Sequence, residues 1–297
     1  MKKIRILSPA KQIDQIHVDF AEEFLQKNHF DVEIGTYALG QDHYFSGTIE
    51  ERLSDFQYAI NDPSVDIILC SRGGYGSVQI IDQLDFSAFK EKPKLIVGYS
   101  DITVFHNHIY GQLGFPSLHA TAPLNFASNS LEALASMLNA INGNANRYEF
   151  DSHISNIIGE AEGNVIGGNL AIVYSLLGTN SDVDFTDKIL FIEDVGEAIY
   201  AIDRMFYAFE KAGRLKQLKG VIVGGLTNMK DSEIPFGITV EEVIQNHIQK
   251  YSIPLAFNFP AGHIDDNRAV MIGVMAKIEV GENGSTFEQK FNRQTIL

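Results

Sequence analysis

Short apolar runs alternate with helix-like segments through residues 1–113, and this alternation constrains the fold more than any other feature. Each apolar run is too short for a helix and is bounded by turn-forming residues, which is typical of buried strands. The predicted strands are residues 4–7, 30–34, 65–70 and 95–98, and the predicted helices are residues 18–27, 49–61, 77–84 and 103–113. An alternation of this kind predicts a parallel sheet with helices on both faces.

A second structural unit is predicted after residues 142–162, where Asn, Gly, Ser and acidic residues replace the periodic pattern. We interpret this stretch as the crossing between two domains, residues 1–150 and residues 151–297. The second unit is predicted to have strands at residues 188–192 and 220–225, helices at residues 197–212 and 240–249, and a β-rich portion at residues 269–280. The expected fold class is α/β in two domains.

The charge of the chain limits its partners. Its 297 residues include 23 basic and 38 acidic side chains, which gives a formal net charge of −15. Such a chain repels phosphate backbones, so no nucleic-acid partner is expected. The single cysteine, Cys70, rules out an intramolecular disulfide and fits a reducing compartment. Because neither a signal peptide nor an apolar stretch of membrane-spanning length is apparent, we expect a cytoplasmic protein without membrane contact.

A serine follows the predicted strand 95–98 at the point where a helical pattern begins. In Gly98-Tyr-Ser100-Asp101 the hydroxyl of Ser100 is expected at a sharp turn between a strand and a helix. Hydrolases place a nucleophile at such a turn, where the free N–H groups of the helix can stabilise an oxyanion. Serine is also a favoured helix N-cap, and Ile102 stands where the nucleophile-turn motif has its last glycine. The tetrapeptide alone leaves both interpretations open.

A glycine-rich loop, Ser71-Arg-Gly-Gly-Tyr-Gly76, follows the predicted strand 65–70. No Gly-Lys-Ser/Thr sequence follows it, so a nucleotide-binding P-loop is not indicated. The glycines either permit a tight turn or let bare backbone approach a ligand, with an N–H group directed at a developing negative charge. In a parallel sheet this loop and the turn at Ser100 lie at the same carboxyl edge, where active sites form.

A carboxylate and a histidine of the second unit can complete a site with Ser100. Glu193 directly continues a buried apolar run, and a buried carboxylate needs a partner. His263 lies in a loop rich in turn-forming residues, where it is either a general base or an ordinary loop histidine. His263, Asp265 and Asp266 are side chains that can bind metals, but their spacing matches no zinc pattern, so a metal site is not favoured.

Other histidines and the cysteine are alternatives for the same chemistry. His106 and His108 are nearer to Ser100 in the sequence, but they fall within the predicted helix and point along it. His119 ends a strand and is the more serious alternative base. Cys70 precedes the glycine loop, where a buried cysteine is more typical of packing than of catalysis.

Five segments taken together resemble the LD-carboxypeptidase family of serine peptidases, which includes the microcin C immunity peptidases. The segments occur in the family's order and cover nearly the whole chain. They are Ser71-Arg-Gly-Gly-Tyr-Gly76, Gly98-Tyr-Ser-Asp101, Gly167-Gly-Asn-Leu170, Phe191-Ile-Glu-Asp194 with Asp203-Arg204, and Pro260-Ala-Gly-His263. Two segments depart from the family pattern, and they are the turn Ser8-Pro9-Ala10 and the longer segment His119-Ala-Thr-Ala-Pro123.

The resemblance implies a role for each of these positions. Ser100 is expected to be the nucleophile, His263 the base and Glu193 the acid that orients it, and the backbone N–H groups of Gly74 and Asp101 are expected to bind the oxyanion. The family fold implies an N-terminal Rossmann-like domain, a C-terminal mostly β (α+β) domain, an active site between them and a homodimer. No metal and no cofactor is expected.

The resemblance also suggests a substrate. This is a murein tetrapeptide, from which terminal D-alanine is released by hydrolysis of an L,D amide bond during peptidoglycan recycling. Arg72, Tyr75 and Asn169 are candidate substrate-binding residues. One alternative is a microcin-type immunity peptidase that cleaves an aminoacyl-nucleotide conjugate, with Phe185 or Tyr200 stacked on the base. Another is a non-catalytic binder of cell-wall peptides. The absence of tryptophan favours the murein substrate over the nucleotide conjugate.

Overall fold

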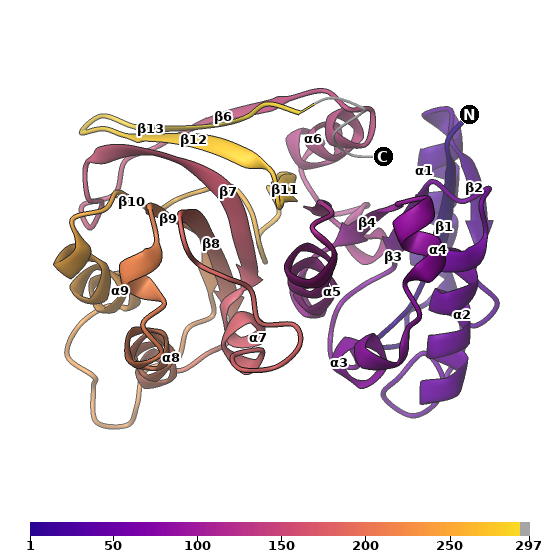
Figure 1. Cartoon of the computed structure of the whole chain (residues 1–297), viewed down its shortest axis with the longest axis horizontal. Coiled ribbons are helices and arrows are strands. Elements are labelled where there is room, and N and C mark those ends of the chain that lie inside the picture. Colours follow the sequence, from indigo (N-terminus) through magenta and orange to yellow (C-terminus); the bar gives the residue numbers. More distant parts are fainter. Residues whose placement is uncertain (292–297) are drawn as a thin grey trace.

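The computed structural model describes residues 1–291, and these form two β-sheets that lie side by side (Figure 1). The first sheet has the strand order β11-β5-β4-β3-β1-β2. All of its strands are parallel except β11, which pairs antiparallel with β5. Its strands are β1 (Lys3–Leu7), β2 (Asp31–Ile34), β3 (Ile67–Cys70), β4 (Leu95–Gly98), β5 (Ser117–His119) and β11 (Val270–Ile272).

The second sheet has the order β10-β9-β8-β7-β12-β13-β6. The four strands β10, β9, β8 and β7 are parallel, and β12, β13 and β6 continue the sheet in antiparallel fashion. Its strands are β6 (Asn146–Phe150), β7 (Gly159–Asn169), β8 (Lys188–Val195), β9 (Gly220–Thr227), β10 (Leu255–Ala256), β12 (Met275–Val280) and β13 (Ser285–Gln289). The predicted fold class is confirmed.

Helices cover both faces of the first sheet and one face of the second. The helices are α1 (Gln15–Lys27), α2 (Ile49–Asn61), α3 (Ser77–Ile80), α4 (Ser87–Glu91), α5 (Thr103–His108), α6 (Leu131–Ile141), α7 (Leu170–Ser175), α8 (Ile199–Lys211) and α9 (Val240–Ile248). Side chains of α1 and α6 share one apolar core with the first sheet, and those of α2, α4 and α5 share the core on its other face. The helices α7, α8 and α9 pack on the second sheet in a third core.

One face of helix α8 is buried in the core beside the second sheet. Ile202, Phe206 and Phe209 are fully buried and Ile199 packs at the edge of the same core, because a spacing of three and four residues places them on one helix face. Gly213 follows the helix with φ of 72°, a left-handed conformation that glycine adopts without strain.

Three sequence expectations differ from the structure. The crossing predicted at residues 142–162 includes the strand β6 and the start of β7. The strand predicted at residues 188–192 continues to Val195, so Glu193 lies within β8. The portion predicted at residues 269–280 divides into β11 and β12, which belong to different sheets. The boundary at residue 150 stays a prediction, since β6 before it lies in the second sheet and β11 after it lies in the first.

Helix α5 joins the two sheets. Thr103 Oγ1 accepts a hydrogen bond of 3.0 Å from the backbone N–H of Asn169, and Asn107 Nδ2 donates to the carbonyl of Gly167 at 3.2 Å. A Cβ atom on Gly168 would lie 2.5 Å from Thr103 Oγ1, so this close approach requires glycine. The contact fixes the carboxyl end of β7 beside the helix that follows Ser100. No helix within residues 1–291 combines the length and apolar character needed to cross a membrane.

His106 of α5 is a buried histidine with both ring nitrogens engaged. Its Nδ1 lies 2.9 Å from Ser117 Oγ and its Nε2 lies 2.9 Å from the carbonyl oxygen of Gly98. Because a carbonyl only accepts, Nε2 carries the proton and Nδ1 accepts from the serine. Burial, together with the neighbouring His119, lowers the pKa of His106 to about 3. The hydrogen bonds of its ring therefore link β4 to β5.

The titration of His106 predicts a measurable pH dependence of stability. Its pKa of about 3 lies below the ordinary value of 6.5, so the unfolded chain binds the proton first and the stabilisation is lost as the pH falls below 6.5. Between about pH 7.5 and about pH 5, His106 should contribute a loss of about 2 kcal/mol. Urea unfolding of wild type and His106→Gln at both pH values should therefore show a smaller pH effect in the variant. The matched control, His43→Gln at an exposed site, should keep the wild-type pH effect.

Candidate active site

Ser100 stands at a strained turn directly after β4. Its φ angle is 64°, which is unfavourable for a residue with a Cβ atom, and the short 3-10 turn Ser100–Ile102 leads into α5. A Cβ on Gly98 would lie 2.9 Å from Ile102 and 3.2 Å from Cys70, so these two side chains pack tightly against the turn. Neither helix start at this turn has a side-chain cap. The hydroxyl of Ser100 is therefore free for another partner.

That partner is His263. His263 Nε2 lies 3.2 Å from Ser100 Oγ, and His263 Nδ1 lies 2.6 Å from Glu193 Oε2. The backbone N–H of His263 also donates to Glu193 Oε2 at 3.2 Å. The structure thus brings together three side chains that are separated by 93 and 70 positions and that come from the turn after β4, from β8 and from the loop after β10. The imidazole lies between the hydroxyl and the carboxylate.

Glu193 is fully buried, and only its histidine neighbours make this possible. It lies in β8 opposite Asn169 of β7, and its carboxylate reaches His263. Burial alone would raise the pKa of Glu193, but the neighbouring imidazoles of His263 and His119 outweigh it and hold the pKa below its ordinary value. Burial would lower the pKa of His263, and the Glu193 carboxylate raises it above 6.5 instead. Each group favours the charged form of the other.

The loop that carries His263 is fixed on two sides. A Cβ on Gly262 would lie 2.6 Å from Glu193 Cβ, and the residue has φ of 107°, so glycine is required on both grounds. Asn267 Oδ1 accepts from the Gly262 N–H at 2.7 Å. Ser130 at the start of α6 donates to Asp266, and Arg268 pairs with the same carboxylate. These contacts hold the loop that carries the imidazole in place.

The glycine loop 71–76 covers Ser100 from the other side. A Cβ on Gly73 would lie 2.6 Å from Ser100 Cβ and 3.0 Å from the backbone nitrogen of Asp101. Gly74 has φ of 124°, and a Cβ there would meet Lys11 and Tyr44. Bare backbone therefore lies directly against the serine, as the second interpretation of the glycines requires.

Two buried charged side chains support this loop. Asp101 Oδ2 accepts from the backbone N–H of Ser77 at 2.8 Å, which ties the turn after Ser100 to the end of the loop. Arg52 of α2 donates to the carbonyls of Pro9, Gly47 and Gly76, and it is almost fully buried. Sequence reasoning missed Arg52. Its spacing of four and seven residues from Phe56 and Ala59, which puts Arg52 on the apolar face of the predicted helix, was the available signal.

The three candidate substrate-binding residues differ in their surroundings. Arg72 donates to the carbonyl of Gln12 at 3.2 Å, and its Nε is buried without a hydrogen-bond partner. Tyr75 is about half exposed beside Phe45. Asn169 is the N-cap of α7 and also donates to Asp194 at 3.0 Å.

The alternative residues are placed away from the hydroxyl of Ser100. Cys70 is fully buried and its pKa is raised by burial, so it is no nucleophile. His106 is engaged by β4 and β5, and His108 is bonded to Ser181. Within residues 1–291 no group of three or more His, Cys, Asp or Glu side chains is arranged to hold a metal ion.

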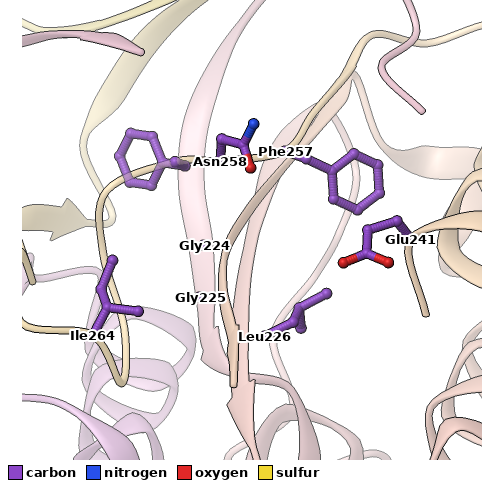
Figure 2. A pocket seen from close by; sticks show the side chains of 8 residues that line it. Gly224, Gly225, Leu226, Glu241, Phe257, Asn258 and Ile264 are labelled. Atoms are coloured by element: carbon purple, nitrogen blue, oxygen red, sulfur yellow. The ribbon is translucent and has the colours of Figure 1, made fainter. Parts of the chain in front are cut away.

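A cavity of about 330 Å³ lies behind the histidine loop (Figure 2). Ile264, the neighbour of His263, points into it, and Phe257 and Glu241 lie on the other side of Leu226. None of the side chains at positions 100, 193 and 263 lines it. The cavity is separate from the serine and the imidazole.

Comparison with known proteins assigns the family. The N-terminal domain model of the LD-carboxypeptidases matches residues 4–120, and the C-terminal domain model of the same family matches residues 162–278. The chain belongs to the LD-carboxypeptidase family. It is accordingly a serine-type carboxypeptidase, as predicted.

Individual relatives agree with this assignment. A probable murein peptide carboxypeptidase of Bacillus subtilis is 30% identical, over 96% of this chain and 91% of its own length. The crystal structure of a muramoyltetrapeptide carboxypeptidase from Oxalobacter formigenes superposes with a TM-score of 0.89 at 25% identity, covering 97% of this chain and 99% of that chain. The microcin C7 self immunity protein MccF, bound to aspartyl sulfamoyl adenosine, shares the fold with a TM-score of 0.86 at 22% identity, over 100% of this chain and 97% of its own.

The contact between Gly73 and Ser100 makes a testable prediction. Gly73→Ala would place a methyl group 2.6 Å from Ser100 Cβ and 2.8 Å from its Oγ, so the serine must shift. We expect acylation of Ser100 by a fluorophosphonate to slow by about 100-fold while the fold is retained. Gly114→Ala is the matched control, because nothing lies within 4 Å of its Cβ and its positive φ adds only backbone strain. Equal labelling rates in wild type and Gly73→Ala would contradict the close contact.

Proposed function

We propose that the protein is an LD-carboxypeptidase that uses Ser100, His263 and Glu193 as a catalytic triad and releases D-alanine from a murein tetrapeptide. The observation that carries this proposal is the pair of contacts from Ser100 Oγ to His263 Nε2 and from His263 Nδ1 to Glu193 Oε2. A nucleophile, a base and an orienting acid in this order are the requirements of serine hydrolysis. The family names of its relatives point to the same class of peptide bond.

In the proposed mechanism, His263 Nε2 takes the proton of Ser100 while Oγ forms a bond to the carbonyl carbon of the L,D amide. Glu193 keeps the Nδ1 proton on the imidazole and stabilises the imidazolium. The tetrahedral intermediate collapses when His263 gives its proton to the nitrogen of the leaving D-alanine and the C–N bond breaks. Water then attacks the ester, with His263 again as the base, and Ser100 is regenerated.

The oxyanion is proposed to bind the backbone N–H groups of Gly74 and Asp101. The contact of Gly73 with Ser100 and with the Asp101 nitrogen supports this, because both donors belong to backbone packed against the nucleophile. A donor of this kind contributes about 3 kcal/mol to the transition state. Arg52 and the Asp101 carboxylate hold the two backbone segments together, which preorganises the site.

Arg72 is the proposed partner of the terminal carboxylate of the substrate. Its guanidinium has a buried Nε without a partner, and a carboxylate is the group that a guanidinium binds through two parallel hydrogen bonds. Tyr75 is exposed beside it and is the proposed contact for the peptide chain. Asn169 already caps α7, so its proposed part in substrate binding relies on its remaining amide hydrogen.

The alternative substrate, an aminoacyl-nucleotide conjugate, is supported by the fold shared with MccF. A stacked base needs an exposed aromatic ring. Phe185 is fully buried, so it is unable to stack, whereas Tyr200 is about half exposed with Arg204 over its ring. The predicted homodimer, cytoplasmic location and role in peptidoglycan recycling stay predictions.

Product analysis tests the reaction. Incubation with murein tetrapeptide should yield the tripeptide and free D-alanine by mass spectrometry, and Ser100→Ala should reduce the rate by about 10⁴-fold or more. A parallel incubation with an aminoacyl sulfamoyl adenosine measures the alternative. Tight tetrapeptide binding without turnover or fluorophosphonate labelling would support the non-catalytic binder and end the enzyme proposal.

Full activity in excess EDTA is expected, because the triad needs no metal.

The contact between Glu193 and His263 predicts how kcat/KM falls on the acid side of its pH profile. The base must be neutral, and the carboxylate raises the pKa of His263, so kcat/KM should fall as the pH drops below a value higher than 6.5. Glu193→Gln removes this charge, so this acid limb of the profile should move to lower pH while kcat falls by about 10³-fold. Glu162→Gln, an exposed acid on β7, is the matched control. An unmoved limb in Glu193→Gln would show that another group sets it.

A further inference from the structure

His119 lies on the far side of Glu193 from the catalytic histidine. It ends β5 and is fully buried, with its ring edge-on to Phe191 at a centroid distance of 4.9 Å and near Tyr99 at 6.0 Å. Its backbone is held on both sides, since it pairs with Gly98 of β4 and with Val270 of β11. The backbone at His119 is therefore fixed, and the packed ring is confined to small side-chain movements.

Two unsatisfied polar groups face each other at this position. Neither ring nitrogen of His119 has a hydrogen-bond partner, and Glu193 Oε1 has none either. His119 Nε2 and Glu193 Oε1 are 4.0 Å apart, whereas the other carboxylate oxygen accepts twice from His263. Buried polar atoms without partners are rare and costly, and a small side-chain rotation pairs these two.

We propose that His119 is a positioning residue of the triad, whose Nε2–H donates to Glu193 Oε1 during the catalytic cycle. Each carboxylate oxygen then has its own imidazole donor, and the order of groups becomes His119, Glu193, His263 and Ser100. The His119 donor fixes the carboxylate plane, which in turn fixes the tautomer and direction of His263. This inference rests on the roles proposed for Ser100, Glu193 and His263.

The other polar groups near His119 already have hydrogen-bond partners, so Glu193 is the acceptor that His119 can reach. His106, the nearest ring on α5 at 6.2 Å, has both nitrogens occupied by Ser117 and Gly98. The hydroxyl of Tyr99 is engaged by Asn125 at 2.7 Å. Within residues 1–291, the titratable group near His119 that presents an unpaired acceptor is Glu193, through its Oε1.

The sign of the pH effect follows from which state the donor stabilises. With His263 neutral, the Glu193–His263 pair carries a net negative charge, and a donor at Glu193 Oε1 stabilises this state most. Adding a proton to the pair reduces that benefit. Removing the donor therefore makes the pair bind its proton more tightly, and the acid limb of the pH profile should move upward by about one pH unit.

Three substitutions separate the donor from the packing role. His119→Phe keeps an aromatic ring of similar size and removes the donor, so we expect kcat to fall about tenfold with KM unchanged and the acid limb to rise. His119→Gln places an amide nitrogen near the position of Nε2 and should restore both readouts. His119→Asn is too short to reach Glu193 and should behave like the phenylalanine variant.

The measurements are kcat, KM and the pH dependence of fluorophosphonate labelling of Ser100. Urea unfolding checks that each variant is folded, and Ser100→Ala is the control for labelling. Wild-type kinetics and an unmoved limb in folded His119→Phe would overturn the inference and leave the triad intact. If that variant does not fold, the Gln and Asn variants decide, because equal behaviour of the two also overturns it. Labelling that persists in Ser100→Ala overturns the proposed triad itself, so the two failures are distinct.

Discussion

A charged carboxylate within a strand and away from water sets the strongest constraint on this molecule. Transferring an isolated carboxylate into a protein interior costs several kcal/mol, so Glu193 is stable there only beside hydrogen-bond donors. His263 supplies two hydrogen bonds, and its imidazole compensates the negative charge when it is protonated. The loop after β10 must therefore approach β8 closely, which is the reason that a side chain at Gly262 has no room. The acid and the base proposed for the active site thus belong to one buried, hydrogen-bonded pair.

The second constraint is the contact of α5 with the carboxyl end of β7. Helix α5 starts directly after Ser100, and its Thr103 and Asn107 bond to the backbone of β7. Figure 1 shows α5 between the two sheets, and its contact with β7 places Ser100, the proposed nucleophile, near the end of the second sheet that carries Glu193. The strained backbone at Ser100 is retained because the glycine loop on one side and α5 on the other determine it. Positioning of the serine thus depends on packing between the two sheets.

Much of this arrangement could be predicted from local sequence. The apolar runs place β1, β3 and β4 correctly, because buried parallel strands need short continuous apolar segments. The glycines after β3 and the serine after β4 indicated a site at the carboxyl edge of the first sheet, since successive strands of a parallel sheet end on the same side. Pairing across long distances was not predictable in this way. The return of β11 to the first sheet and the approach of His119 to Glu193 depend on contacts between residues far apart in the chain.

The sequence by itself determined the α/β class, the positions of most elements and the residue types that chemistry requires, because these follow from local periodicity and from motifs in fixed order. The family resemblance implied His263 as the partner of the serine, but local sequence left three histidines open, and only the tertiary structure decided which of them faces the serine. His106, His119 and His263 are all buried or half-buried imidazoles, and only the packing of the two sheets assigns the first to the link between β4 and β5, the second to the far side of Glu193 and the third to Ser100. Hydrogen bonds act over about 3 Å, and distance along the chain carries no information at that scale.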